Sequence, residues 1–280
     1  MKMKFTKMHG CGNDYVYVDC MDRMLPNPGK ISEFVSRRRF GIGSDGLICI
    51  CPSDKADFRM RMFNADASEG KMCGNGSRCI AKYVYDKGLT DKTDITLETK
   101  SGIKKLHLNP ENGKVKTVEV DMGEAILKPR DIPMNADGDS FVNKPVAVDG
   151  KEQNITAVSM GNPHAVIFTV SIDKLDLEKI GPSYENHPLF PKRVNTEFCE
   201  VIDSRTLKMR VWERGSGETW ACGTGACATA VAAVLNGFCK RDEEITLKLR
   251  GGDLKITYRS DNHVIMCGEA ETVFEGEINL

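Results

Sequence analysis

At 280 residues, with 40% hydrophobic and 28% charged content, the chain has the size of two ordinary domains and the composition of a soluble globular protein. Its net charge of −1, with both signs scattered, argues against a nucleic-acid binder, and its longest apolar run, 226–235, is too short to cross a bilayer. The charged first residues are followed by no apolar segment, so we expect no secretory signal, no membrane partner and a reducing cytoplasmic location.

Short segments rich in β-branched and aromatic residues predict that strands dominate the chain. In chain order, we expect strands at 15–19, 47–51, 58–63, 95–99 and 115–120 with helices at 31–39 and 77–87, then strands at 165–170, 206–212, 245–249 and 254–258 with helices at 175–185 and 226–235. The stretch 128–139 is expected to be a linker or a surface loop. Many strands with few helices favour an α+β fold.

An internal duplication explains why similar elements occur twice. Cys73-Gly-Asn-Gly76 and Cys222-Gly-Thr-Gly225 lie 149 positions apart, and the same offset places residues 59–64 on residues 208–213. A one-residue slip then aligns 95–97 with 245–247. The sequence therefore predicts two pseudo-symmetric duplicated domains. The first is expected at 1–122 together with a C-terminal strand at 268–280, and the second at 123–267.

Each Cys-Gly-x-Gly phrase leads directly into a predicted helix. Unpaired N–H groups and the helix dipole favour anions at such a position, which predicts a lowered pKa for the thiols of Cys73 and Cys222. The neighbouring backbone N–H groups are suited to a substrate carboxylate. The other cysteines singled out are expected to be small buried hydrophobic residues rather than disulfide partners: Cys20, Cys49, Cys51, Cys199, Cys239 and Cys267.

Two such loops on opposite sides of one molecule could invert a carbon atom next to a carboxylate. A thiolate on one face would remove the α-proton, backbone donors would stabilise the enediolate, and a thiol on the other face would return a proton. No zinc-ribbon spacing, H-E-x-x-H motif or phosphate-binding loop occurs, so we expect neither a metal nor a cofactor.

Long motifs around both cysteines resemble the two signatures of the diaminopimelate epimerase family. They are residues 63–79 and 211–227, and the segments 8–15, 160–164 and 194–198 fit the same family, so the resemblance covers essentially the whole chain. It implies interconversion of LL- and meso-2,6-diaminopimelate by a two-base thiol mechanism without pyridoxal phosphate, in lysine and peptidoglycan-precursor synthesis. It also implies two α+β domains, each a mixed curved sheet around a central helix, with the substrate in the cleft between them.

The resemblance also assigns the remaining site residues. It implies catalysis by Cys73 and Cys222, with His164 and Gly46 in supporting positions. The substrate-binding set is Asn13, Asn64, Gly74, Asn75, Asn162, Asn195, Glu213, Arg214, Gly223 and Thr224. Asparagine side chains offer both donors and acceptors to a diamino diacid. Arg214 is suited to the distal carboxylate because its planar fork binds in two places, and Glu213 could receive an ammonium group.

Two positions depart from the family pattern. Many relatives carry Gln where Gly46 stands, so a side-chain contact to substrate there would be missing or supplied by backbone or water. The family often has Gly where Ala67 stands, which is mildly costly if that turn needs a positive φ.

Two alternatives remain open at this point. One is another racemase on the same scaffold, of the proline or hydroxyproline type, although those carry His where this chain has Asn75. The other is a non-catalytic thiol redox sensor. The expected partner is a small diamino diacid, with no nucleic acid, and a homodimer is possible.

Overall fold

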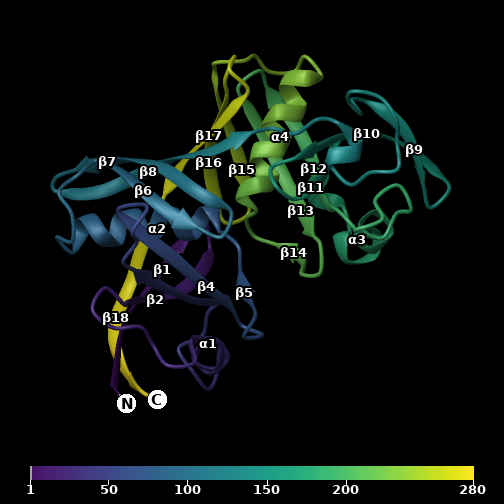
Figure 1. Cartoon of the computed structure of the whole chain (residues 1–280). Helices are drawn as coiled ribbons and strands as arrows, with labels where there is room; N and C mark the ends of the chain where they lie inside the picture. The colour runs from purple at the N-terminus through teal and green to yellow at the C-terminus, as the bar shows by residue number, and fades with distance from the viewer. Residues whose placement is uncertain (1) are drawn as a thin grey trace. The chain divides into compact units, whose positions relative to one another are not determined.

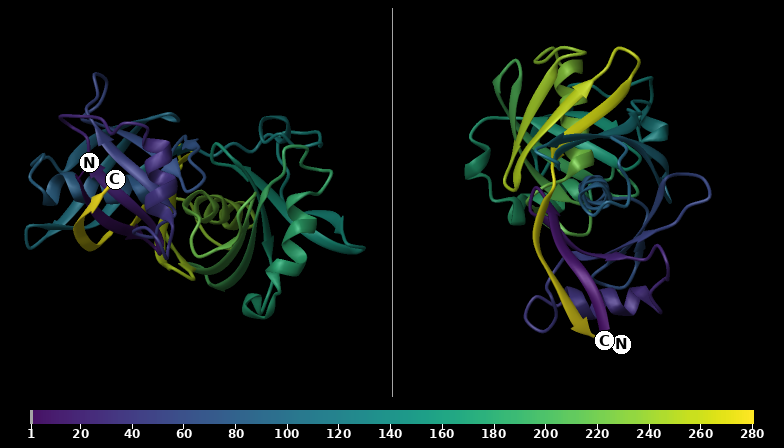
Figure 2. Two further views of the ribbon diagram at one scale, coloured as in Figure 1. Left: turned by 90° about the horizontal axis from the view of Figure 1, so that it is seen from below. Right: turned by 90° about the vertical axis from the view of Figure 1, so that its left-hand side faces the viewer.

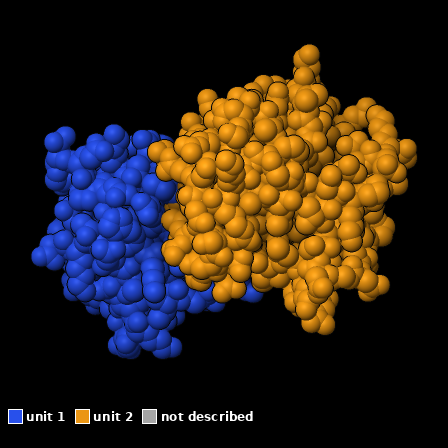
Figure 3. Space-filling view, turned by 90° about the horizontal axis from the view of Figure 1, so that it is seen from above, with its two compact units in different colours: residues 1–121, 267–280 blue, residues 122–266 orange. Residues whose placement is uncertain are grey.

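The computed structural model describes residues 2–280, which divide into two compact units (Figure 3). Unit 1 comprises the chain up to Asp121 together with Cys267–Leu280, and unit 2 is Met122–Met266. The last strand of the chain therefore returns to the first unit, where Lys2 lies opposite Asn279, and the two termini lie side by side (Figure 2).

The strands of unit 1 pair in one continuous series, and the C-terminal strand of the chain lies at one end of that series. Its strands are β1 (Lys2–Gly10), β2 (Asn13–Asp19), β3 (Gly46–Cys51), β4 (Phe58–Asn64), β5 (Glu69–Gly70), β6 (Asp94–Thr99), β7 (Gly102–Glu111), β8 (Lys114–Glu124) and β18 (Glu271–Asn279). They pair in the order β18–β1–β2–β3–β4–β6–β7–β8, with β5 on β4. Two pairings are parallel, β2 with β3 and β4 with β6, because a helix lies between the members of each pair in the sequence.

Unit 2 repeats this arrangement. Its strands are β9 (Lys144–Val148), β10 (Lys151–Ser159), β11 (Pro163–Phe168), β12 (Asn195–Asp203), β13 (Thr206–Glu213), β14 (Gly217–Thr219), β15 (Glu244–Leu249), β16 (Gly252–Tyr258) and β17 (His263–Glu269). The pairings β11–β12 and β13–β15 are parallel, like β2–β3 and β4–β6. The registers also match, since Tyr15 lies opposite Gly46 and His164 lies opposite Asn195. The pairing pattern confirms the duplication.

Each sheet curves around one buried helix (Figures 1 and 2). In unit 1 this is α2 (Gly74–Asp86), which packs against β1, β2 and β7. In unit 2 it is α4 (Gly223–Leu235), which packs against β10, β11, β12, β15 and β16. Residues 226–233 of α4 are all buried, so the longest apolar run of the sequence is a core helix whose small side chains admit strands on several sides. No helix within residues 2–280 is long and apolar enough to span a membrane.

An outer helix covers each sheet. In unit 1, α1 (Pro28–Ser36) packs on β3 and β4, and in unit 2, α3 (Leu177–Glu185) packs on β12, β13 and β14. Helix α3 holds the end of β13 in place because Glu185 accepts hydrogen bonds from Trp212 Nε1 at 2.7 Å and from the Gly215 N–H at 2.9 Å. The turn that carries Glu213 and Arg214 is thereby fixed to the core.

The predicted strands are all present, but several helix bounds differ from prediction. Helices α2 and α4 begin at Gly74 and Gly223, three residues earlier than expected, because the glycine-bearing phrases are the first helical turn rather than a turn before it. Helix α1 runs from Pro28 to Ser36 instead of 31–39, since Pro28 suits the first helical position. The supposed linker contains a short 3₁₀-helix, Pro129–Asp131, and packs Ile132 into the core of unit 2.

We expect Gly181→Ala to lower the free energy of unfolding of unit 2 by about 1–3 kcal/mol, the usual cost of overpacking. A Cβ at this position would lie 2.2 Å from Trp212 Cδ2, which outweighs the gain of about 1 kcal/mol that alanine brings to a helix. Urea unfolding followed by tryptophan fluorescence measures this, because both tryptophans, Trp212 and Trp220, lie in unit 2. Lys179→Ala on the exposed side of the same helix is the control, and a Gly181→Ala protein at least as stable as wild type would contradict the packing argument.

Candidate active site

Both Cys-Gly-x-Gly phrases place a thiol as the cap of a buried helix. Cys73 caps α2 with φ −135°, and its sulfur accepts a hydrogen bond from the Gly76 N–H at 3.3 Å. Cys222 caps α4 with φ −123°, and its sulfur accepts from the Gly225 N–H at 3.3 Å. The first N–H groups of a helix have no carbonyl in a preceding turn, so those of residues 74–75 and 223–224 are suited to an anion.

Glycine at the third helical position of each phrase allows a side chain of the neighbouring strand to approach the helix closely. A Cβ on Gly76 would lie 2.7 Å from Ile48 Cδ1 of β3, and a Cβ on Gly225 would lie 2.6 Å from Glu197 Oε1 of β12. The neighbouring strand therefore lies directly against each helix start. This contact also shows a residue that the sequence reasoning missed, Glu197, which is buried beside Cys222.

In unit 1, the predicted residues gather at the ends of three adjacent strands. Asn13 begins β2, Gly46 begins β3, and Asn64 ends β4 directly opposite Gly46. Asn13 Oδ1 accepts hydrogen bonds from the Cys73 thiol and from Asn75 Nδ2, both at 3.3 Å. Asn64 instead donates from Nδ2 to Ser68 Oγ at 2.9 Å, across its own turn.

In unit 2, the same three strand ends carry Asn162, Asn195 and Glu213. Asn195 Nδ2 donates to the Pro163 carbonyl, and its Oδ1 accepts from the Arg214 N–H at 2.9 Å. The Arg214 guanidinium donates to the Lys192 carbonyl at 2.9 Å. Glu213 accepts a short hydrogen bond from the Thr219 hydroxyl.

A chain of polar contacts leads from Glu197 to Cys222. Glu197 Oε1 lies 2.7 Å from His164 Nδ1, and both side chains are fully buried. His164 Nε2 lies 3.1 Å from Asn162 Oδ1, and Asn162 Nδ2 donates to Thr224 Oγ1 at 3.2 Å. The Thr224 hydroxyl lies 3.5 Å from the Cys222 sulfur.

The two thiols differ in their electrostatic surroundings although their backbones match. The duplicated frame places His164 on Tyr15, Glu197 on Ile48 and Glu213 on Asn64. At these three positions, unit 1 carries neutral side chains and unit 2 carries ionisable ones.

The expected lowering of the Cys222 pKa is wrong. Burial, together with the negative charges of Glu213 and Glu197, raises the pKa of Cys222 well above its ordinary value, and the hydrogen bonds from Thr224 and Gly225 only partly offset this. Burial also raises the pKa of Glu213. The sequence indicated the position of Cys222 at a helix start, but not its burial or the two carboxylates nearby.

The two departures from the family pattern have different outcomes. Ala67 has φ 70°, so its turn does use the left-handed conformation that favours glycine. At Gly46, a Cβ would lie 2.2 Å from the Phe63 carbonyl oxygen, so this backbone leaves no room for a side chain there. Any contact made by residue 46 must come from its main chain.

The remaining cysteines are mostly core residues, as expected: Cys20, Cys49, Cys51, Cys199 and Cys239 are buried, whereas Cys267 is half-buried. Among residues 2–280, no group of three or more His, Cys, Asp or Glu side chains is arranged to hold a metal ion.

We expect the alkylation rate of Cys222 by iodoacetamide to rise with pH only above the midpoint of about 8.5 typical of a free thiol. Glu213→Gln should move that midpoint to lower pH, because it removes a negative charge that opposes thiolate formation. The measurement is the pH dependence of alkylation at the Cys222 peptide by mass spectrometry. Glu200→Gln, on the same strand as Glu197, should leave the midpoint unchanged; an equal shift in both variants would refute a local effect.

A family model and similar curated proteins both identify the diaminopimelate epimerase family. The model described as diaminopimelate epimerase matches residues 5–128 and 156–273. The diaminopimelate epimerase of Acetivibrio thermocellus is 60% identical over 279 residues, covering 99% of both chains, and that of a Methanococcus maripaludis strain is 56% identical over 279 residues, covering 99% of this chain and all of its own.

Solved structures share the fold at low identity. A phenazine biosynthesis protein of the PhzF family from Bacillus anthracis has a TM-score of 0.70 at 16% identity, with full coverage of both chains. A hydroxyproline epimerase from Agrobacterium vitis has a TM-score of 0.67 at 14% identity, covering 99% of this chain and 91% of its own. These likenesses confirm the expected fold and carry no information on the substrate.

Proposed function

Because the chain belongs to the diaminopimelate epimerase family, we propose that it interconverts LL- and meso-2,6-diaminopimelate. The observation that carries this proposal is the pair of thiol-capped helix starts, one in each duplicated unit. The identity of 60% to a diaminopimelate epimerase over nearly the whole of both chains supports this substrate over other amino acids.

In the proposed reaction, Cys73 and Cys222 serve opposite faces of the α-carbon. One sulfur, as thiolate, takes the α-proton, so the C–H bond breaks, an S–H bond forms, and the electron pair moves into the carboxylate as an enediolate. The other thiol then gives its proton to the opposite face, and it is left as the thiolate. The backbone N–H groups at residues 74–75 and 223–224 would hold the carboxylate while its charge grows.

Because its pKa is high, Cys222 would keep its proton in the empty site and would have to release it to solvent water before acting as the base. Without substrate, burial and two nearby carboxylates favour the thiol. An ammonium group of the substrate placed beside Glu213 would offset these negative charges, which favours the thiolate only when the site is filled. In this proposal the base is therefore formed by substrate binding rather than by the helix dipole alone.

The remaining residues select the substrate. Arg214 would bind the distal carboxylate through its planar fork, while Asn64, Asn162 and Asn195 would contact the amino and carboxylate groups. Gly46 would contribute through its main chain, since a side chain has no room there. His164 would act through Asn162, with which it is in contact.

We further propose that the protein works without metal or cofactor, in the cytoplasm, in lysine and peptidoglycan-precursor synthesis, and that it can form a homodimer. A proline-type racemase remains the second candidate because hydroxyproline epimerases share the fold. The thiol redox sensor is the third candidate. Exchange of the α-proton with deuterated water, compared for diaminopimelate and proline, separates the three.

Cys73→Ala and Cys222→Ala should each abolish epimerisation, because inversion needs a base on one face and an acid on the other. Cys→Ser variants should retain slow deuterium exchange from one face, since a hydroxyl can return a proton but is a weak base at neutral pH. We would follow deuterium incorporation into LL- and meso-substrate separately, with fully active wild-type protein dialysed against chelator as the reference. Cys73→Ser and Cys222→Ser should show opposite stereochemical preferences, and matching preferences would mean that the thiols do not serve opposite faces.

Arg214→Lys should impair specificity more than turnover, because lysine keeps the charge but loses the planar fork. We expect KM for diaminopimelate to rise about tenfold or more, the scale of one charge-assisted hydrogen bond. The discrimination between diaminopimelate and lysine should also fall. Arg205→Lys, an exposed conservative change in the same unit, should leave both unchanged. Unaltered discrimination in Arg214→Lys would remove the distal carboxylate from this residue.

A further inference from the structure

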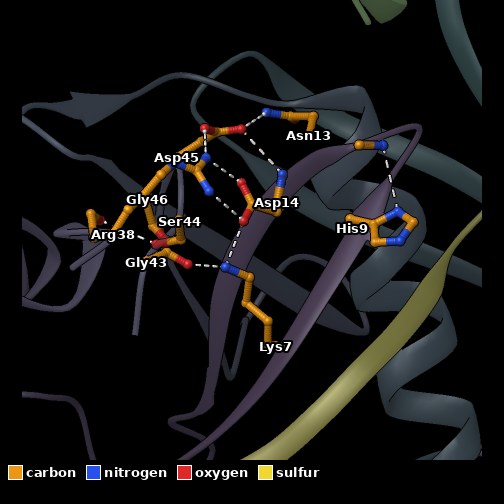
Figure 4. A network of polar contacts seen from close by, with 11 residues as sticks. Lys7, His9, Asn13, Asp14, Arg38, Gly43, Ser44, Asp45 and Gly46 are labelled. Atoms are coloured by element: carbon orange, nitrogen blue, oxygen red, sulfur yellow. Dashed lines mark hydrogen bonds and ion pairs between the residues drawn. The ribbon is translucent and has the colours of Figure 1, made fainter. Parts of the chain in front are cut away.

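We propose that Asp45 is a positioning residue that holds the Asn13 carboxamide with its oxygen toward the Cys73 thiol. Asp45 lies in the loop before β3 and belongs to a polar network around Asn13, Asp14 and Arg38 (Figure 4). The inference rests on the proposed function, in which Cys73 carries a proton, but it concerns a residue that does not touch that sulfur.

The orientation of Asn13 follows from what each group can donate. Asp45 Oδ2 accepts from Asn13 Nδ2 at 2.8 Å and from the Asp14 N–H at 3.1 Å. A carboxylate only accepts hydrogen bonds, so it selects the NH₂ end of the carboxamide. The oxygen end is thereby left for the Cys73 thiol and Asn75 Nδ2, each at 3.3 Å. Turning the carboxamide over would bring two acceptor oxygens together.

Asp45 is itself held by charge. Arg38 Nη2 lies 2.9 Å from both Asp45 Oδ1 and Asp14 Oδ1, and Asp14 lies 2.6 Å from the buried Lys7 ammonium. Lys7 also donates a short hydrogen bond to the Gly43 carbonyl (Figure 4). Two anions and two cations therefore alternate behind Asn13, and this network fixes the loop that carries Asp45.

Unit 2 lacks this device and orients its asparagine differently. The duplicated frame places Val194 on Asp45, and a valine cannot accept a hydrogen bond. In its place, His164 Nε2 contacts the oxygen of Asn162, so the NH₂ end of Asn162 is directed to Thr224. Paired asparagines thus present opposite ends to the two helix starts: an oxygen to the Cys73 thiol in unit 1, and an NH₂ group to the hydroxyl next to Cys222 in unit 2.

An acceptor beside a thiol stabilises its protonated form. Asp45 therefore helps Cys73 to keep its proton until the reaction uses it, by way of Asn13. The other titratable groups around Cys73 do not ionise in the same range, because burial raises the pKa of Tyr15 and Tyr17 well above 10 and that of Cys79 to about 12. The nearby charges are carried by Lys7, Asp14, Arg38 and Asp45, and by the buried Arg78, which donates to Asn75 Oδ1 at 3.0 Å.

The test separates the charge of Asp45 from its hydrogen bond. Asp45→Asn removes the charge, but its oxygen still accepts from Asn13 Nδ2 and the Asp14 N–H, while Arg38, which is mostly exposed, can turn to water. Asp45→Ala removes both. We would measure the pH midpoint of iodoacetamide alkylation at Cys73 without substrate. The midpoint should stay near wild type in Asp45→Asn and fall in Asp45→Ala, and equal shifts in the two variants would overturn the proposal in favour of a purely Coulombic effect.

A double-mutant cycle tests whether Asp45 acts through Asn13. Asp45→Ala should lower kcat about tenfold, the scale of one lost hydrogen bond, yet cost nothing further in an Asn13→Ala background. Additive losses would overturn the proposal. If Asp45→Ala fails to fold, Asp45→Ser replaces it, since a hydroxyl can still serve the Asp14 N–H but is too short to reach Asn13. An inactive wild type would refute the proposed function alone, because the alkylation midpoints need no substrate.

Discussion

In each unit, the candidate site depends on a cysteine thiol that caps a helix whose first turn contains two glycines. A cysteine sulfur that accepts from the N–H three residues ahead is held directly over the helix N-terminus, in both units at 3.3 Å. At positions 76 and 225 of these helix starts, a Cβ would lie within 2.7 Å of a side chain of the neighbouring strand. The same glycines leave the first turn open to a ligand carboxylate. The thiol cap, the contact with the neighbouring strand and the anion site therefore all follow from one local geometry, which occurs once in each unit.

The duplication gives the two helix starts the same backbone geometry, but the side chains around them differ. At three positions beside the helix starts, unit 1 carries the uncharged side chains of Tyr15, Ile48 and Asn64. The equivalent positions in unit 2 carry His164, Glu197 and Glu213. A reaction that runs in both directions needs a base and an acid whose roles can exchange. In the proposed reaction, the two thiols have equivalent backbone positions, and the unequal fields would determine where the proton rests before the substrate arrives.

Features that depend on neighbouring residues could be predicted from the sequence, whereas features that depend on residues far apart in the chain could not. The repeated phrases and the strand-rich halves are local or periodic signals, and the duplicated fold that they predicted is present. The helix starts at Gly74 and Gly223 were missed because glycine ordinarily ends a helix, and the sulfur cap that helps to stabilise these first turns is not visible in the sequence. The pKa of Cys222 was predicted in the wrong direction because its burial, and the approach of Glu213 and Glu197 from other strands, are set by the tertiary fold rather than by the local sequence. The offset of 149 could have revealed Glu197, since it places a carboxylate on buried Ile48.

The buried pair of Glu197 and His164 is not needed to build the fold. Unit 1 forms the same strands and the same helix start with Ile48 and Tyr15 in their places. In unit 2, Glu197 Oε2 is buried with no hydrogen-bond partner among residues 2–280, a destabilising arrangement that an isoleucine would avoid. Because packing does not account for the pair, its role lies in its effect on the residues that it contacts. Glu197 lies against Gly225 of α4, and it adds to burial and Glu213 in raising the pKa of Cys222. His164 orients Asn162. The strain in unit 2 is thus located where the proposed chemistry requires a field that unit 1 does not have.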